Sequence, residues 1–288
     1  NGVNSVKKVI IIGSGPAGIS ASLYTIRAGI ETIIISKADT ALNKAEKIEN
    51  YYGFSEGISG SELYKNGIDG ALRLGVKLIN EEVFAIGYNE KFTVLTDKAE
   101  YDADAVIICT GSGRHTPKIK GLNDFDGKGI SYCAVCDAFF YRNKDVAVLG
   151  SGSYALHEAN ELVALAKSVT IVTNGEKAKA DFPENMKVIE KKILSLGGET
   201  TLEKIEFDDG EELNINGLFI AYKVAGSTAL AKKIGAVTTE KAIKVDENMK
   251  TSIDGLYAAG DCTGGLLQIA KAVYEGAKAG MEVSKHLR

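Results

Sequence analysis

Residues 9–18 read VIIIGSGPAG, and this stretch decides the fold that we expect for the chain. Val9–Ile12 form a short, continuous apolar run, which is typical of a parallel strand buried on both faces. Gly13, Gly15 and Gly18 follow at G-x-G-x-x-G spacing, and residues 19–29, ISASLYTIRAG, have apolar positions at helical spacing. Such a turn lets a pyrophosphate approach the backbone at a helix N-terminus. The stretch therefore predicts a Rossmann-type unit that binds a dinucleotide.

A second strand–turn–helix pattern begins at Asp145. Asp145–Leu149 is a predicted strand, Gly150–Ala155 has G-x-G-x-x-A spacing, and residues 154–166 have a helical pattern. The chain is therefore predicted to be an α/β protein with two Rossmann-like, three-layer ββα-type nucleotide-binding domains. The second unit is curtailed, because only residues 173–217 separate its second strand from the next apolar strand.

The composition is that of a soluble globular protein. Of the 288 residues, 45% are hydrophobic and 25% are charged, and the net charge of −4 does not favour nucleic acid as a partner. No apolar run approaches the roughly 18 residues of a membrane span, and no secretory pattern opens the chain. We therefore expect a cytoplasmic enzyme without a membrane or nucleic-acid partner.

Residues 133–137 read CAVCD, a C-x-x-C pair followed directly by an acid. In a chain with four cysteines such a pair is half of a zinc site, part of an iron–sulfur ligand set, or a dithiol redox centre. The C-terminal segment 251–261, TSIDGLYAAGD, leads through Gly264 and Gly265 into a final predicted helix. A carboxylate at such a strand end can meet a bound polyol, which would suit a flavin.

These motifs together resemble the low-molecular-weight thioredoxin reductases of the flavoprotein disulfide reductase superfamily. The resemblance covers nearly the whole chain and rests on residues 13–18, 49–53, 110–111, 133–141, 150–155, 259–261 and 268. It implies FAD, a homodimer, and an FAD domain built from residues 1–113 and 242–288. The inserted central domain, residues 114–241, would carry the dithiol and a degenerate pyridine-nucleotide unit.

The resemblance also implies a role for each member of the dithiol site. Cys136 would face the flavin, Cys133 would exchange with the disulfide of thioredoxin, and Asp137 would be the acid/base that protonates the departing thiolate. The residues that the resemblance assigns to FAD binding are Gly13, Gly15, Pro16, Ala17, Gly18, Ser36, Lys37, Asn50, Thr110, Gly111, Gly260, Asp261, Gln268 and Ile269. Ser36 and Lys37 stand where an acid for the adenosine ribose is usual, so the ribose needs another partner.

A metal site is not expected, because the pair lacks further ligands at suitable spacing. Cys109 and Cys262 are distant in sequence, and His115, His157 and His286 show no paired spacing. Cys109 lies in an apolar strand, so we expect it, like Cys262, to be a packed thiol. For His157 we expect a surface or capping role.

The electron donor is the point at which the sequence departs from relatives that use NADPH. These relatives place a His-Arg-Arg cluster where residues 173–179 here read TNGEKAK, and no arginine occurs between Arg142 and Arg288. Lysine lacks the bidentate fork of arginine, so we expect no tight NADPH clamp. This pattern resembles the ferredoxin-dependent flavin thioredoxin reductases, which implies reduced ferredoxin as the donor.

A ferredoxin partner would need a basic docking surface, for which Lys118, Lys120, Lys128, Lys232 and Lys233 are candidates. Two alternatives stay open. One is an NAD(P)H-dependent thioredoxin reductase with an atypical nucleotide site, where NADH would require Glu176 to contact a ribose hydroxyl. The other is a flavin-containing redox sensor whose dithiol does not turn over.

Overall fold

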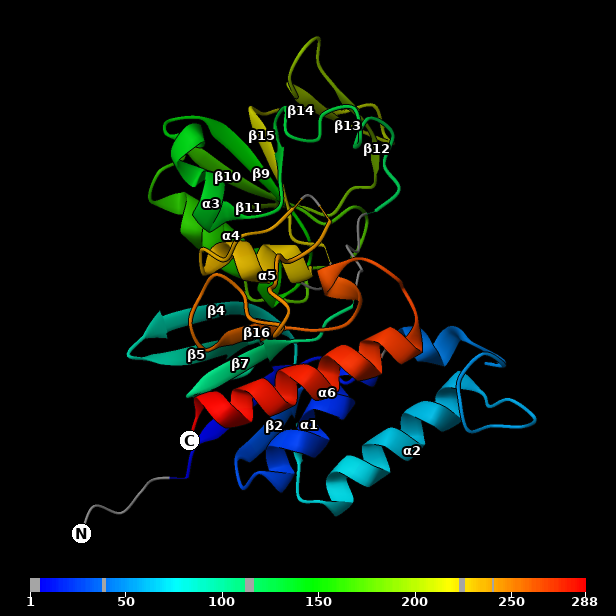
Figure 1. Ribbon diagram of the computed structural model, residues 1–288. Coiled ribbons are helices and arrows are strands. Elements are labelled where there is room, and N and C mark those ends of the chain that lie inside the picture. The colour runs from blue at the N-terminus through cyan, green and yellow to red at the C-terminus, as the bar shows by residue number, and fades with distance from the viewer. Residues whose placement is uncertain (1–5, 38–39, 112–116, 223–225, 240) are drawn as a thin grey trace. The chain divides into compact units, whose positions relative to one another are not determined.

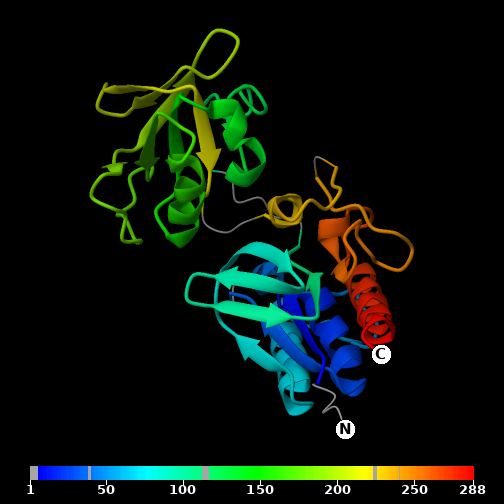
Figure 2. The same ribbon diagram turned by 90° about the vertical axis from the view of Figure 1, so that its left-hand side faces the viewer.

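The computed structural model describes residues 6–37, 40–111, 117–222, 226–239 and 241–288. The chain forms two compact units: unit 1 comprises Asn1–Gly113 with Gly226–Arg288, and unit 2 comprises Arg114–Ala225 (Figures 1 and 2). The first domain boundary expected from the sequence, 113/114, and His115 lie outside the described residues. The α/β fold with an inserted second unit is confirmed.

Unit 1 is organised around a five-stranded parallel sheet. Its strands lie in the order β16 (Leu256–Ala258), β7 (Ala105–Ile108), β1 (Lys8–Ile12), β2 (Glu31–Ile35) and β3 (Lys77–Ile79). Strand β16 comes from the C-terminal segment and pairs with β7, with Leu256 opposite Val106. Because β16 completes a sheet that begins at β1, the two ends of the chain form one domain.

Helices and a small antiparallel sheet complete unit 1. The helices are α1 (Pro16–Arg27), α2 (Gly60–Arg73), α5 (Ser227–Lys233) and α6 (Ile269–His286), with short 3-10 turns η1 (Ala41–Lys44) and η3 (Asp261–Thr263). The antiparallel sheet contains β4 (Val83–Asn89), β5 (Lys91–Thr96) and β6 (Glu100–Ala103). All four residues of β7 are buried, as expected for a central parallel strand.

Helices α1 and α6 lie side by side along the sheet (Figure 1). Their close approach depends on two glycines of α6. A Cβ atom on Gly276 would lie 2.1 Å from the carbonyl oxygen of Ala17, and one on Gly280 would lie 2.5 Å from that of Ala21. The N-terminal helix and the C-terminal helix are thus locked together at backbone distance, which fixes the segments that flank the glycine turn.

The second boundary of the units differs from the one that we expected. Residues 226–241 belong to unit 1, whereas the sequence analysis assigned them to the central domain. Helix α5 packs against β4, and the Lys233 ammonium donates to the carbonyl oxygen of Phe84 at 2.9 Å. This packing joins segments about 150 positions apart, so no local pattern predicted it.

Unit 2 contains a second five-stranded parallel sheet. The order is β11 (Lys187–Ile189), β10 (Ser168–Val172), β9 (Asp145–Leu149), β15 (Gly217–Ile220) and β8 (Ile130–Ser131). Helices α3 (Ala134–Asp137) and α4 (Ser153–Val163), the 3-10 turn η2 (Ala138–Tyr141) and an antiparallel sheet of β12 (Ile193–Gly197), β13 (Lys204–Phe207) and β14 (Glu212–Asn214) complete it. Residues 173–216 are all described and form no helix between β10 and β15.

None of the helices among the described residues combines the length and the apolar character that a membrane crossing requires.

Candidate functional site

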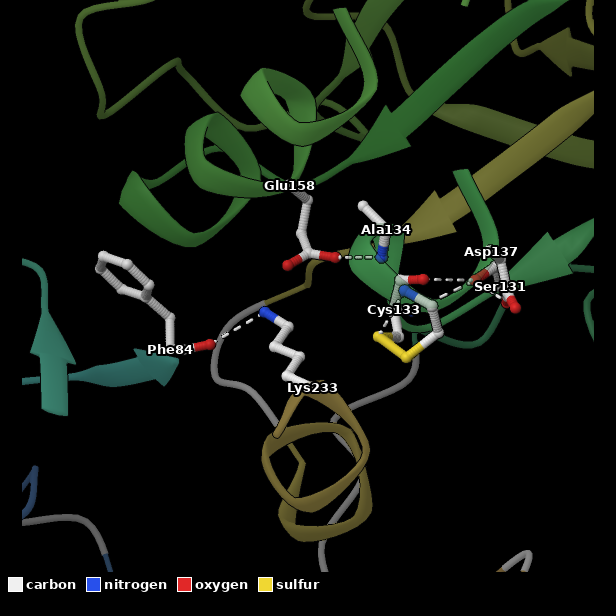
Figure 3. The surroundings of a disulfide bond; sticks show 8 residues. Phe84, Ser131, Cys133, Ala134, Asp137, Glu158 and Lys233 are labelled. Carbon is white, nitrogen blue, oxygen red and sulfur yellow. Dashed lines mark hydrogen bonds between the residues drawn. A yellow bond between two sulfur atoms is a disulfide. The ribbon is translucent and has the colours of Figure 1, made fainter. Parts of the chain in front are cut away.

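Cys133, at the N-terminus of α3, and Cys136, within α3, form a disulfide with their Cα atoms 5.3 Å apart (Figure 3). Cys133 is the N-cap of α3, and its sulfur accepts a hydrogen bond from the Cys136 amide at 3.2 Å. Cys133 is 3% exposed, whereas Cys136 lies on the surface. The C-x-x-C pair predicted from the sequence is therefore a disulfide whose two cysteines differ in exposure.

Two side chains that the sequence analysis did not identify hold the backbone and the acid of this turn. The Ser131 hydroxyl donates to the Asp137 carboxylate at 2.6 Å and accepts from the Cys133 amide at 3.2 Å. The carboxylate of Glu158, on α4, accepts from the Ala134 amide at 2.7 Å (Figure 3). Glu158 is 1% exposed. In the sequence it shares the apolar face of the predicted helix with Ala155 and Leu162, and an acid on such a face indicates a buried carboxylate that needs a hydrogen-bond donor.

An apolar surface adjoins the disulfide in unit 2. Phe139 and Phe140 are each 69% exposed, and Val135, between the two cysteines, is also exposed. Exposed phenylalanines in a pair are unusual on a monomeric surface and are typical of a contact site for another protein. The disulfide is thus flanked by a surface that suits a protein partner.

The first glycine turn, in unit 1, is built from backbone at close range. A Cβ on Gly13 would lie 2.3 Å from the Cys109 carbonyl oxygen, and one on Gly18 would lie 1.9 Å from that of Gly13. By contrast, a Cβ on Gly15 would have no atom within 4 Å. Gly15 is the N-cap of α1, and Pro16 and Ala17 begin that helix. The turn thus presents bare backbone toward open space at a helix N-terminus, where an anion is stabilised.

Thr110 lies beside this turn at the end of β7, since its Cα would be 3.2 Å from a Cβ on Gly13. Its hydroxyl is buried and has no hydrogen-bond partner among the described residues. A buried hydroxyl without a partner is costly, so it indicates a position where a polar ligand group is expected. Gly111 follows with a φ of 73°, a conformation that favours glycine.

Asn50, Gln268, Ile269, Ser36 and Lys37, also assigned to cofactor binding from the sequence, contact other side chains or lie beside residues that do. Asn50 donates to the Gln268 side chain at 3.0 Å across 218 positions of sequence, and Ile269 begins α6 directly after it. Ser36 accepts a hydrogen bond from Ser14 of the glycine turn at 3.0 Å. Lys37 instead pairs with Glu82 at 2.7 Å, a contact that raises the pKa of the lysine. Its ammonium group is therefore engaged within the protein.

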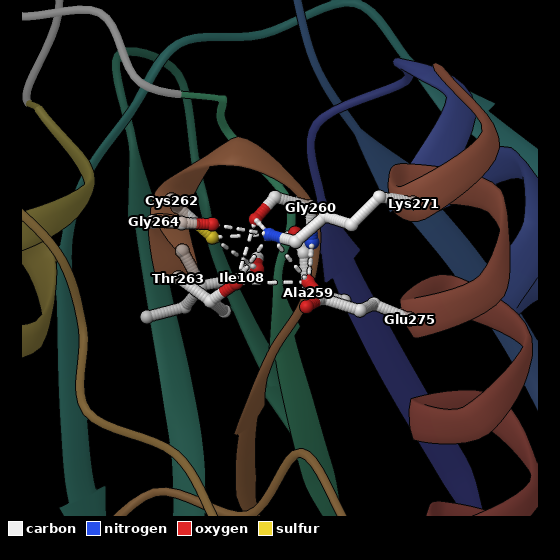
Figure 4. Close-up of polar contacts among 8 residues, drawn as sticks. All are labelled: Ile108, Ala259, Gly260, Cys262, Thr263, Gly264, Lys271 and Glu275. Carbon is white, nitrogen blue, oxygen red and sulfur yellow. Dashed lines mark hydrogen bonds and ion pairs between the residues drawn. The ribbon is translucent and has the colours of Figure 1, made fainter. Parts of the chain in front are cut away.

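The turn that carries Asp261 is held by a nearly buried ion pair (Figure 4). Lys271 donates to the carbonyl oxygens of Gly260 and Gly264 at 2.9 and 2.6 Å and lies 3.0 Å from Glu275. The Glu275 carboxylate in turn accepts from the Gly260 amide at 2.8 Å, and both side chains also contact the Thr263 hydroxyl. The Lys271 and Glu275 side chains are only 15% and 12% exposed.

This network fixes a conformation that glycine makes possible. Gly260 and Gly264 have φ angles of 88° and 79°, which residues with a Cβ rarely adopt. Gly260 also lies against α1, because a Cβ on it would be 2.9 Å from the Cβ of Ala17. The structure thus brings the 13–18, 110–111 and 260–261 segments together, as the sequence analysis required. Burial raises the pKa of Asp261 at this position.

In unit 2 a carboxylate of the same polypeptide, that of Glu176, contacts the second glycine turn. The Glu176 carboxylate accepts from the Ser151 hydroxyl and from the Lys179 ammonium, both at 2.8 Å, and the Tyr222 hydroxyl donates to it at 3.4 Å. The contacts with Lys179 and Ser151 lower the pKa of Glu176. Lys177 pairs with Glu190 at 2.7 Å. Both lysines of the 173–179 segment are thus paired with carboxylates.

The two remaining cysteines are packed thiols. Cys109 and Cys262 are buried, and burial raises the pKa of Cys262 to about 12 and that of Cys109 well above its ordinary value. The Cys262 thiol donates to the carbonyl oxygens of Ile108 and Ala259 at 3.3 and 3.2 Å. Among the part of the chain that the structure describes, no group of three potential metal ligands comes together.

Comparison with known proteins assigns the chain to a family. The pyridine nucleotide-disulphide oxidoreductases match residues 7–276, which is most of the chain. The chain belongs to this family. Members of the pyridine nucleotide-disulphide oxidoreductase family related to thioredoxin reductase bind FAD.

Three relatives illustrate its place among the pyridine nucleotide-disulphide oxidoreductases. The thioredoxin reductase of Streptomyces coelicolor is 37% identical over 239 residues, covering 76% of this chain and 74% of the relative. The crystal structure of the atypical thioredoxin reductase TRi from Desulfovibrio vulgaris Hildenborough has a TM-score of 0.88 and 39% identity, with 98% of both chains covered. A ferredoxin-flavin thioredoxin reductase from Clostridium acetobutylicum has a TM-score of 0.69 and 32% identity, with 97% of this chain and 98% of the other covered.

The residues of unit 1 fit the FAD of a pyridine nucleotide-disulphide oxidoreductase. The bare backbone at Gly15 leaves room for a pyrophosphate, and the buried Thr110 hydroxyl offers a hydrogen-bonding group that no described residue uses. Asp261 stands on a preset turn at the end of β16, where a carboxylate can accept from hydroxyl groups. Gly15, Thr110 and Asp261 are therefore placed where they could contact a bound dinucleotide, and the other assignments stay predictions from the sequence.

Replacing Lys271 with methionine should weaken FAD retention in this pyridine nucleotide-disulphide oxidoreductase. The change leaves Glu275 as an uncompensated, mostly buried charge, which costs about 3–5 kcal/mol, and releases the 260–264 turn. We expect a lower unfolding midpoint and faster FAD release, measured by the gain in flavin fluorescence.

The matched control for this prediction is Lys285→Met on the same helix. It breaks the pair with Glu282, in which the Lys285 side chain is 68% exposed and the Glu282 side chain 16%. The two variants thus leave carboxylates of similar burial, but only Lys271 also donates to carbonyl oxygens of the 260–264 turn, so FAD retention should not change in Lys285→Met. Equal FAD affinity of Lys271→Met and the wild type would show that the ion pair does not shape the cradle.

Proposed function

We propose that this protein is a thioredoxin reductase that takes its electrons from reduced ferredoxin. The observation that carries the donor assignment is the Glu176 carboxylate, which lies against the glycine turn of the second Rossmann unit through Ser151. The proposal for the acceptor rests on the Cys133–Cys136 disulfide and on the names of the relatives, three of which are thioredoxin reductases.

Glu176 disfavours NADPH in two ways. Its negative charge stands beside the turn that would receive the nucleotide, and it holds Lys179, one of the two lysines available for a 2′-phosphate. The other, Lys177, is paired with Glu190. Although pairs this exposed are weak, a phosphate would have to displace carboxylates from both lysines without the help of an arginine. One of the relatives, from Clostridium acetobutylicum, is named as a ferredoxin-flavin enzyme.

The dithiol chemistry follows from the residues of unit 2. When bound, FAD supplies a redox group that can accept electrons singly and deliver them in pairs. We propose that Cys136 receives the electron pair, so that the disulfide becomes two thiols, and that Cys133 as a thiolate attacks the disulfide of thioredoxin. Asp137 is 2.6 Å from the Ser131 hydroxyl at the same turn and would donate the proton to the departing thiolate.

Surfaces for two protein partners are available on the individual units. Phe139 and Phe140 form an exposed apolar surface next to the disulfide, which would contact thioredoxin. Of the lysines considered for an acidic ferredoxin, Lys118, Lys120, Lys128 and Lys232 are exposed, whereas Lys233 is half-buried and donates to Phe84. The homodimer and the cytoplasmic location stay predictions from the sequence.

An anaerobic titration of the FAD absorbance tests the donor. Reduced ferredoxin should bleach the flavin and support thioredoxin reduction. NADPH should bleach it at least about 100-fold more slowly, because the charge-assisted bonds of a phosphate clamp, each worth about 1.5–3 kcal/mol, are missing. Dithionite serves as the control that the flavin can be reduced.

Each alternative has its own outcome in this titration. Rapid bleaching by NADPH or NADH at micromolar concentration would overturn the ferredoxin assignment and favour an NAD(P)H-dependent reductase with an atypical site. If ferredoxin or dithionite reduced the flavin but thioredoxin then stayed oxidised, the protein would be a redox sensor and not a reductase.

A further inference from the structure

The Ser131 hydroxyl connects the cysteine backbone to the acid of the dithiol turn. It accepts from the Cys133 amide at 3.2 Å and donates to the Asp137 carboxylate at 2.6 Å (Figure 3). A third contact, to the Cys133 carbonyl oxygen, is longer at 3.4 Å. Since a hydroxyl has a single proton, the shorter contact, to the Asp137 side chain, takes it. The Cys133 amide therefore donates to the Ser131 hydroxyl, and the Ser131 hydroxyl donates to Asp137.

The surroundings hold this hydroxyl in place. Ser131 is 4% exposed and ends β8, which pairs with β15 through Ser131 and Phe219. The strand therefore fixes the Ser131 backbone, and the acceptor and donor on either side fix its side chain. Asp137, by contrast, ends the one-turn helix α3 and is partly exposed, so its carboxylate depends on a neighbour for its orientation.

We propose that Ser131 is a positioning residue that holds the Asp137 carboxylate beside Cys133 for proton transfer during disulfide exchange. The proposal rests on the proposed function, since Asp137 is the acid/base of that reaction. It adds a residue that acts only through Asp137, to whose carboxylate the Ser131 hydroxyl donates.

The exchange that Ser131 would assist is balanced as follows. The Asp137 carboxylate first accepts the proton of the Cys133 thiol. The Cys133 thiolate then forms a bond to one sulfur of the partner disulfide, the partner's sulfur–sulfur bond breaks, and the departing thiolate takes that proton from Asp137. The Asp137 carboxylate then accepts the proton of the Cys136 thiol. The Cys136 thiolate attacks the sulfur of Cys133 in the mixed disulfide, which restores the Cys133–Cys136 bond and releases the second partner sulfur as a thiolate that is protonated by water.

A double-mutant cycle tests whether Ser131 acts through Asp137. The full chain is reduced anaerobically with dithiothreitol, freed of reductant, and mixed with hydroxyethyl disulfide, whose departing alkyl thiolate needs a proton because its pKa is about 8.5 or higher. Oxidation of the dithiol is followed by alkylation and mass spectrometry. Ser131→Ala should slow the reaction about tenfold, and Asp137→Asn should slow it about 100-fold or more.

The decisive comparison is the double variant. If Ser131 acts through Asp137, Ser131→Ala adds no further loss in the Asp137→Asn background, and Ser131→Thr, which keeps the hydroxyl, is faster than Ser131→Ala. If the losses multiply, Ser131 acts on the turn itself and the proposal is wrong. It is equally wrong if Ser131→Ala reacts at the wild-type rate.

The small disulfide separates this proposal from the proposed function. A wild-type protein that exchanges with hydroxyethyl disulfide but leaves thioredoxin oxidised would contradict the thioredoxin assignment alone. Glu161→Asn, at an exposed position of α4, serves as a surface control and should react at the wild-type rate.

Discussion

Replacing Cys133 with serine should abolish thioredoxin reduction while leaving reduction of the bound FAD intact. The variant keeps Cys136 but has lost the sulfur that is assigned to attack, and the disulfide of the wild type can no longer form. Removal of a nucleophile costs on the order of 10⁴-fold or more in turnover. The measurement is thioredoxin reduction beside flavin bleaching with the same donor.

The order of the two cysteines is tested by trapping. Cys136→Ser should accumulate a mixed disulfide between Cys133 and thioredoxin, because the second thiol is missing, whereas Cys133→Ser should accumulate none. This test is informative because exposure alone would favour Cys136 as the cysteine that attacks thioredoxin. Cys136 is exposed, whereas Cys133 is 3% exposed. A mixed disulfide on Cys136 in the Cys133→Ser variant would reverse the assigned roles.

Gly15→Ala should produce a folded protein that has lost FAD. The backbone of Gly15 has φ −69° and ψ −177°, which alanine adopts without strain, and the new methyl group would meet no atom within 4 Å. That methyl group would stand in the space where the pyrophosphate approaches the α1 N-terminus. Loss of one charge-assisted hydrogen bond corresponds to about 100-fold in affinity. Flavin absorbance of the purified protein and FAD titration of the stripped protein measure this.

Gly18→Ala is the matched variant, in the same turn but with the opposite expected outcome. Its methyl group would lie 1.9 Å from the Gly13 carbonyl oxygen, so the turn or the helix must move. Overpacking against backbone costs about 3 kcal/mol or more, and the unfolding midpoint should fall even without FAD. Wild-type FAD affinity of Gly15→Ala, or an unchanged midpoint of Gly18→Ala, would contradict the assignment of this turn.

Local sequence determined the two strand–turn–helix units and the disulfide, because each depends only on residues close together in the chain. The apolar runs of β1 and β9 and the glycine turns that follow them specify strand, turn and helix within about twenty residues each, because strand burial and glycine conformation are local requirements. The disulfide is equally local, since three positions separate its cysteines.

The domain boundary and the electrostatic environment of the site were not available from local sequence. Residues 226–241 belong to unit 1 because α5 meets β4, about 150 positions away. The sequence showed that the 173–179 segment lacks arginine. Only the fold showed that Glu176 reaches Ser151, 25 positions earlier, and so stands at the glycine turn.

Tertiary structure alone decided which polar groups became partners at the two reactive turns. Ser131 meets Asp137 because β8 and α3 place them on the same side of the disulfide, and Lys271 meets Gly260 because α6 runs back past β16. Hydrogen bonds and ion pairs require atoms within about 3 Å, whereas composition and periodicity constrain only which face a side chain occupies. The sequence by itself therefore determined a two-unit flavoprotein fold with a dithiol, and the packing of distant segments determined what holds the dithiol and the cofactor turn in place.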